Sequence, residues 1–265
     1  MRSTLRLLGI LFLFILLSVL TQIGGIVLLI SILLGKTIRW KNPFKSTFIF
    51  VSLYFLSTFV LVPPLAKMSG REPIKHSQKI QPTALYTVIL NRNYVRPELH
   101  DLLQRAENRL KLSDVGIHYL DASFPFVNGF PLLPHLSHND GKKIDLSLIY
   151  ETPEGRITDK QKSNSGYGVF EEPEKGEFDQ IEKCKTAGYF QYDYPKYLTL
   201  GLINKNLLFS NKGSKLLVEA FLKDQSVGKL FIEPHLKERL HLKNSKIRYH
   251  GCQAVRHDDH IHIQL

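Results

Sequence analysis

The feature that most constrains this chain is a run of 28 residues without a charged side chain, residues 7–34. A helix needs roughly 20 apolar residues to cross the hydrocarbon core of a bilayer, so this run is long enough to span it with some tilt. A second uncharged run, residues 46–66, is also long enough, and Pro63-Pro64 is expected to end its helix. We therefore predict a membrane anchor over residues 1–66, with transmembrane helices at 7–34 and 46–66.

A cleaved signal peptide is the alternative interpretation of the first run, because Arg2 and Arg6 give it a basic start. The apolar stretch is about twice the usual length of a signal-peptide core, and no small-residue cleavage site followed by a polar stretch closes it. A retained membrane helix is therefore the better interpretation.

The positive charge of the chain is concentrated beside these two runs. Residues 1–75 hold nine Lys or Arg and one Glu, whereas residues 76–265 hold 26 Lys or Arg against 23 Asp or Glu. Basic residues that flank apolar helices anchor them and set their orientation. The formal net charge of +11 therefore does not predict a nucleic-acid partner, and the sequence holds no RNA- or DNA-binding motif.

The charges and the cysteines do not decide on which side of the membrane the domain after the second run lies. The connector between the two runs, residues 35–45, holds four Lys or Arg, which the positive-inside rule places in the cytoplasm. The basic N-terminus and the basic segment after the second run compete with it, so charge gives only a slight preference for an exported domain. Cys184 and Cys252 could pair outside the cell or stay as two free thiols.

The rest of the chain is interpreted as a tether, residues 67–83, and a domain, residues 84–265. Helical spacing and strand-like alternation of apolar residues predict the elements of this domain. The predicted helices are 96–112, 213–223 and 234–240, and the predicted strands are 115–120, 144–150, 229–232 and 260–265. Residues 122–138 are expected to form an ordered loop, and residues 151–197 a surface excursion or a flap that faces the substrate.

Five aromatic residues near the end of that excursion have two interpretations. They could line a groove, or they could pack a local core. They are Tyr189, Phe190, Tyr192, Tyr194 and Tyr197.

Two short clusters hold five of the eleven histidines. The first contains His135, His138, Asp140 and Asp145, and the second contains His257, Asp258, Asp259, His260 and His262. In an extended strand, side chains at positions i and i+2 point to the same face, so His260 and His262 are expected to project together. Exposed strand histidines would explain the second cluster taken alone, and a polar residue in a turn would explain Asp145.

Together, the two clusters provide what a catalytic zinc site requires, namely about three protein ligands and an open position for water. His138 and Asp145, with one histidine of the C-terminal strand, form such a set, and Gly141 permits a tight turn between the first two. Asp258 and Asp259 are candidates to orient an imidazole by a hydrogen bond to its other ring nitrogen, or they lie in an exposed turn. We therefore expect Zn²⁺ as the cofactor.

These residues resemble a known group of enzymes. Ser137, His138, Gly141 and Asp145, followed far downstream by His260 and His262, are similar to the motifs of the lysostaphin-type, D-Ala-D-Ala-type and hedgehog-type metallopeptidases. The closer resemblance is to the penicillin-insensitive murein endopeptidases, through residues 133–145, 230–240 and 256–263. Leu133 and Arg256 depart from that family's pattern, which has proline and glycine there, and residues 151–197 differ in length and content.

The resemblance, which covers roughly residues 112–265, implies a role for each motif residue. The implied zinc ligands are His138, Asp145 and His262. His260 would be the active-site base or proton carrier. His257 and His135 would line the site and either help to polarise the scissile carbonyl or hold the substrate. Members of the family cleave peptide cross-links of the bacterial cell wall.

We expect an α+β domain in which an antiparallel sheet with flanking helices carries the zinc site. The expected function is that of a zinc metallopeptidase, of the murein endopeptidase or D,D-carboxypeptidase type, anchored in the bacterial inner membrane with its catalytic domain on the periplasmic side. Its substrate would be peptidoglycan stem peptides or cross-links. The alternatives are a catalytically silent module that binds cell wall or a partner protein, and an enzyme for another substrate such as an amidated peptide or a D,D-dipeptide.

Overall fold

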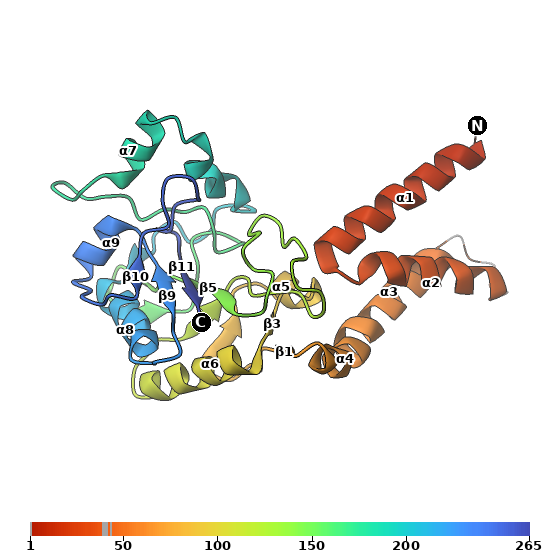
Figure 1. Cartoon of the computed structure of the whole chain (residues 1–265), viewed down its shortest axis with the longest axis horizontal. Coiled ribbons are helices and arrows are strands. Elements are labelled where there is room, and N and C mark those ends of the chain that lie inside the picture. The colour runs from red at the N-terminus through yellow and green to blue at the C-terminus, as the bar shows by residue number, and fades with distance from the viewer. Residues whose placement is uncertain (1, 39–41, 43) are drawn as a thin grey trace. The chain divides into compact units, whose positions relative to one another are not determined.

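The computed structural model describes residues 2–38, 42 and 44–265, so part of the basic connector lies outside the described residues. The chain forms two compact units (Figure 1). The first unit comprises Met1–Ile74, Tyr86–Pro97 and Ser123–Gly141, and the second comprises Lys75–Leu85, Glu98–Ala122 and Lys142–Leu265.

The first unit begins with two apolar helices where one was predicted. α1 (Arg2–Thr21) and α2 (Gly24–Thr37) are separated by a bend at Gln22, whose φ is 66°. A Cβ on Gly25 would lie 2.6 Å from the carbonyl oxygen of Phe14. In a continuous helix two residues eleven positions apart are about 16 Å apart. The chain therefore reverses at Gln22, and the missing side chain of Gly25 lets α2 pack closely on the end of α1 (Figure 1).

The second apolar run stays helical past the two prolines that were predicted to end it. α3 (Lys45–Leu56) leads through a π-helical turn at Ser57–Leu61 into α4 (Val62–Met68). The prolines occupy the start of α4. A proline is tolerated there because the first N–H groups of a helix need no intrahelical acceptor. The π-helical turn changes the hydrogen-bond register of the backbone, so α4 can begin a new register without a break in the helix.

Thr4–Thr21 and Lys45–Met68 are each long and apolar enough to cross a membrane. They meet this criterion by length and apolar composition alone, and a signal sequence near the N-terminus would meet it too. Both helices present mostly exposed apolar side chains, whereas the core helix of a soluble protein is mostly buried.

The segment 67–83, which was predicted to be a tether, is structured. In the first unit β1 (Glu72–Pro73) pairs antiparallel with β3 (Tyr94–Val95). In the second unit β2 (Ile80–Pro82) pairs parallel with β4 (Ile117–Tyr119). The polar composition of the segment concealed these pairs, because short edge strands need little apolar sequence.

The second unit is built on a six-stranded sheet in the order β10-β9-β11-β5-β4-β2. Its remaining strands are β5 (Lys143–Ser147), β9 (Lys229–Phe231), β10 (Ile247–Arg248) and β11 (His260–Gln264). The four inner strands pair antiparallel, as predicted, but β10 and β2 pair parallel with their neighbours, so the sheet is mixed. In both parallel pairs a helical segment separates the two strands in the chain, which is what a parallel connection requires.

The predicted helices of the domain are present. They are α6 (Pro97–Leu110), α8 (Asn211–Leu222) and α9 (Pro234–Arg239). α6 begins with proline and ends in the last turn with a basic residue, both of which favour helix ends. The carboxylate of Asp224, just after α8, accepts hydrogen bonds from Arg105 and Arg109 of α6. This link ties the two helices together at one end.

The excursion 151–197 folds onto its own small core. β6 (Tyr150–Glu151) pairs with β7 (Ile157–Thr158) and β8 (Leu208–Phe209), and the chain then forms α7 (Gln180–Thr186) and a 3-10 helix at Phe190–Leu198.

The aromatic residues of the excursion differ in burial, and Tyr192 takes the predicted role in a local core. Tyr192 is buried with Ile181 and Cys184, whereas Phe190 and Tyr197 are 88% and 73% exposed.

Cys184 and Cys252 form a disulfide that closes a separation of 68 residues. It joins α7 to the segment that leads into β11. Sequence alone had left open whether these two cysteines pair or stay as free thiols. Because a cross-link of this length restricts the unfolded chain, it stabilises the fold by about 2–4 kcal/mol.

We expect the double variant Cys184→Ser/Cys252→Ser to melt roughly 5–15 °C below the unmodified chain in thermal unfolding of the full-length protein in detergent. Reduction of the unmodified chain should lower its melting temperature by a similar amount and leave that of the variant unchanged. Equal melting temperatures for the oxidised chain and the variant would contradict the disulfide.

Candidate metal centre

The strand pair β5 and β11 presents two of the predicted ligands side by side. In the antiparallel register His262 lies opposite Asp145 and His260 lies opposite Ser147. Nδ1 of His262 is 2.8 Å from Oδ1 of Asp145, and Nε2 of His260 is 3.8 Å from the same oxygen. Ile261, which alternates with the histidines, is fully buried in the core. The i and i+2 spacing therefore projects the two imidazoles from one face, as predicted.

The loop Ser123–Gly141 of the first unit carries the other predicted histidines. The rings of His135 and His138 lie 5.7 Å apart, and the backbone N–H of His138 donates to the carbonyl of His135 at 3.0 Å. The hydroxyl of Ser123 donates to the carbonyl of His138. At the end of the loop Gly141 has a φ of 77°, which favours glycine and confirms the predicted tight turn.

Arg71 holds the same loop from within the first unit. Its guanidinium is buried and donates to the carbonyls of Phe124 and Asn139 and to the side chain of Asn128. A Cβ on Gly141 would lie 3.2 Å from Nε of Arg71. The small glycine therefore lets the loop close tightly over this buried charge.

His135, His138 and Asp145 form a group whose ligand atoms all lie within 4.8 Å of one another. His138 and Asp145 are buried, and His135 is half-buried. Two imidazoles and a carboxylate are a donor set that zinc accepts, with metal–ligand distances of about 2.0–2.2 Å. In a tetrahedral zinc site two ligand atoms lie about 3.4 Å apart, so these three atoms would have to come closer together to share one ion. These residues could hold a metal ion.

This group shares His138 and Asp145 with the predicted trio and differs in the third member. His135 was predicted to line the site, and it belongs to the group. His262 was the predicted third ligand, and its Nδ1 contacts Asp145 directly.

The two adjacent acids, Asp258 and Asp259, serve different partners. Oδ1 of Asp259 lies 2.5 Å from Nδ1 of His260, and its Oδ2 accepts from the backbone N–H of Gly168 at 2.6 Å. Asp259 is therefore placed to orient His260 and leave Nε2 as the nitrogen that can exchange a proton. Asp258 instead accepts two hydrogen bonds from Arg256.

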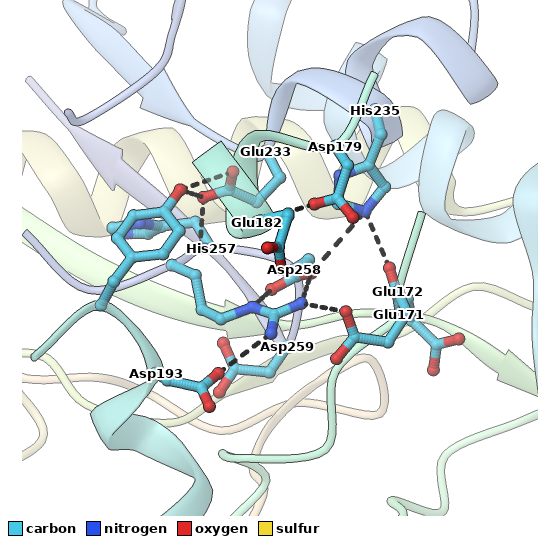
Figure 2. A network of polar contacts seen from close by, with 12 residues as sticks. Glu171, Glu172, Asp179, Glu182, Asp193, Glu233, His235, His257, Asp258 and Asp259 are labelled. Atoms are coloured by element: carbon cyan, nitrogen blue, oxygen red, sulfur yellow. Dashed lines mark hydrogen bonds and ion pairs between the residues drawn. The ribbon is translucent and has the colours of Figure 1, made fainter. Parts of the chain in front are cut away.

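Arg256 is the centre of a buried network in the second unit. Glu172, Asp193 and Asp258 converge on its guanidinium (Figure 2). The guanidinium also lies 3.9 Å from the centre of the Phe170 ring. Arg256 is 2% exposed and Asp258 is fully buried. Burial raises the pKa of Asp258 well above its ordinary value. The network pins the segment before β11 to the excursion.

Glu233 supports the same segment from the start of α9. Its carboxylate accepts the hydroxyl of Tyr192 and the backbone N–H of His257 at 2.9 Å (Figure 2). Burial raises the pKa of Glu233. Glu233 therefore fixes where the chain turns toward His260.

His257 lies among other imidazoles of the second unit. Its ring centroid is 4.8 Å from that of His260 and 5.3 Å from that of His250. Burial, reinforced by the neighbouring histidines, lowers the pKa of His257 well below its ordinary value. His257 is therefore a neutral imidazole at neutral pH, able to donate or accept one hydrogen bond.

Sequence reasoning missed Tyr167, which the excursion delivers to the site. Its hydroxyl donates to Oδ2 of Asp145 at 2.8 Å, and its ring lies edge-on to that of His260 at 5.1 Å. Gly166 and Gly168 flank it, both at positive φ, and a Cβ on Gly168 would lie 2.3 Å from the carbonyl oxygen of Pro195. The Gly-Tyr-Gly triplet was a signal for a tightly held aromatic residue.

His250 was also missed. Its ring packs 4.5 Å from that of Phe231 and 6.5 Å from that of His262. No sequence spacing relates it to the two clusters, because it lies outside regular structure after β10.

No model of a known protein family matches the chain, and no curated protein matches it.

Measuring the metal content of variants would decide whether His262 or His135 is the third ligand. We expect His138→Ala, Asp145→Asn and His262→Ala each to weaken zinc binding at least about 100-fold in the full-length protein, and His135→Ala about 10-fold, because a catalytic zinc uses about three protein ligands. Zinc titration against a chromogenic chelator would measure this. If His135→Ala loses the ion and His262→Ala retains it, His135 is the third ligand and the predicted trio is wrong.

Replacing Arg256 should leave the buried charge of Asp258 without its partner. We expect Arg256→Met to lower the free energy of unfolding by about 3–5 kcal/mol. The control Glu172→Gln removes a partner that is 60% exposed and should cost less than about 1 kcal/mol. Adding Asp258→Asn to Arg256→Met should recover part of the loss. Thermal unfolding with equal midpoints for Arg256→Met and Glu172→Gln would contradict the network's role.

Proposed function

We propose that this chain is a membrane-anchored zinc peptidase that hydrolyses amide bonds in the stem peptides or cross-links of peptidoglycan. The observation that carries the proposal is the His135, His138 and Asp145 group, together with the contact of Asp145 with His260 and His262 in the second unit. Metal-ligating side chains and an oriented general base are the two components that metal-assisted amide hydrolysis requires.

A bound zinc ion would supply a Lewis acid for the scissile carbonyl and a water whose pKa is lowered to about 7. His138, Asp145 and His262 are the side chains that we propose to hold it. His260 is the proposed proton carrier, because Asp259 occupies its Nδ1 and Nε2 faces the carboxylate of Asp145. Nε2 would take a proton from the attacking water and return it to the leaving amine.

Three further side chains are proposed to position this machinery or the substrate. The hydroxyl of Tyr167 holds Oδ2 of Asp145, so it fixes the rotation of that carboxylate. His257, a neutral imidazole, is placed to hydrogen-bond the substrate beside His260. His135 is proposed to line the site from the loop.

The reversal at Gln22 supports an exported catalytic domain. If α1 and α2 are successive passes, the basic N-terminus and the basic connector lie on the same side of the membrane and no longer compete. The positive-inside rule then places both in the cytoplasm, and the third pass, Lys45–Met68, carries the chain out. The 14 residues of α2 rise about 21 Å, so its ends would adjust to the bilayer by local thinning or by Lys side chains that reach the interface.

The disulfide supports the same side of the membrane. Disulfides persist in oxidising compartments such as the periplasm and are rare in the cytosol. The pairing of Cys184 with Cys252 therefore favours a location outside the cytoplasmic membrane. A periplasmic site would have direct access to peptidoglycan peptides.

We expect His260 to be required for hydrolysis but not for zinc binding. We expect the full-length protein to release new amines from cross-linked muropeptides, and a chelator to stop the release until zinc is restored. His260→Ala should retain zinc and lose about 10²–10⁴-fold in rate, whereas His241→Ala, an exposed histidine after α9, should be unchanged. Mass analysis of the products would identify the bond.

A protein that binds muropeptide with zinc in place and releases no amine would be the silent module. That result would contradict the proposed peptidase.

A further inference from the structure

The loop that carries His135 and His138 is built on the ends of the apolar helices. The backbone N–H of Phe126 donates to Oε1 of Gln22 at 2.8 Å. The ring of Phe126 packs on a buried cluster from the helices and the segment that follows them: Ile23, Val27, Tyr54, Val62, Ala66 and Tyr94. The loop Ser123–Gly141 therefore shares one hydrophobic core with the helices, within the first unit.

The part of the helices that holds the loop is where they would leave the membrane. Gln22 lies at the reversal between α1 and α2, which is the end of the first proposed pass. Ala66 lies in the last turn of α4, the end of the final pass. Both ends face the same side in a three-pass topology. In that topology the loop would lie at the outer surface of the bilayer.

The chain folds back onto the helical unit directly after α4. The backbone N–H of Arg71 donates to the carbonyl of Ala66 at 3.0 Å, and Glu72 already pairs in β1. The buried Arg71 side chain then binds the loop itself through Phe124 and Asn139. A site that digests distant cell wall would need a flexible linker here, and the described residues 67–74 are instead folded.

The loop also has the composition of a segment that contacts lipid. Residues 123–141 contain no Lys or Arg and a single Asp. Val127, Leu133 and Leu136 are 53%, 50% and 56% exposed. A loop that exposes several apolar side chains and lacks basic residues is suited to contact with an apolar partner, and the helices on which it packs are themselves apolar.

From these contacts we infer that the substrate peptide is carried by a molecule held in the same membrane, that is, a muropeptide linked through its glycan to a membrane lipid. This inference rests on the proposed function and names its substrate class. The loop would hold the metal-ligating histidines at the height of the lipid headgroups, where the peptide of a lipid-linked substrate is concentrated. Material attached to the distant wall would reach them less often.

The test compares two substrates that carry the same peptide. The full-length protein is reconstituted in phosphatidylethanolamine and phosphatidylglycerol vesicles with either a lipid-linked muropeptide in the bilayer or the lipid-free muropeptide in solution. We expect the initial rate, measured as amine released at equal bulk concentration of substrate, to be at least about tenfold higher for the lipid-linked form. Val127→Asp should reduce this ratio several-fold.

A matched control is Leu208→Asp, which places the same charge at a side chain of similar exposure, 52%, in the second unit. It should leave the ratio unchanged. Equal rates on both substrates, or faster digestion of isolated cell wall, would overturn the inference and leave the peptidase proposal intact. No hydrolysis of either substrate by zinc-loaded protein would contradict the proposed function and the inference with it.

Discussion

The antiparallel pairing of β5 with β11 is the contact on which the rest of the candidate site depends. It sets Asp145 against His262 and brings His260 within 3.8 Å of the same carboxylate. A slip of one residue would turn every side chain of β11 to the opposite face. Ile144 and Ile261 prevent such a slip, because both are fully buried on the other face. The hydrophobic pattern that forms the core therefore also aims the polar residues.

Much of this arrangement could be predicted from the sequence, because it follows from local periodicity. The alternation around His260 and Asp145 and the helical spacing of α6 are short-range patterns, and the structure confirms them. The bend at Gln22 could not be predicted, since it depends on how closely Gly25 approaches Phe14. The mixed sheet likewise depends on edge strands too short to show a pattern. The role of Tyr167 could not be predicted, because the residues it contacts, Asp145 and His260, lie far from it in the sequence.

Arg256 shows how one buried cation can divide the roles of two adjacent acids. A glycine at this position would leave Asp258 without a guanidinium. Burying a carboxylate without a partner is costly, and here Arg256 binds both of its oxygens. Because successive side chains of an extended segment point in opposite directions, Asp259 remains directed at His260. One acid therefore serves the scaffold and the other serves the imidazole.

The residues of the candidate metal group come from segments held by different means. Asp145 is fixed by the sheet and by Tyr167, and the segment before His260 is fixed by Arg256, Glu233 and the nearby disulfide. The loop of His135 and His138 contains no helix or strand of its own, so it takes its order from Arg71 and from the core of the helical unit. Removing the helices would therefore remove a structural support of the loop. The apolar helices thus belong to the folding unit of the loop, which is why the full-length chain is the form in which its chemistry should be measured.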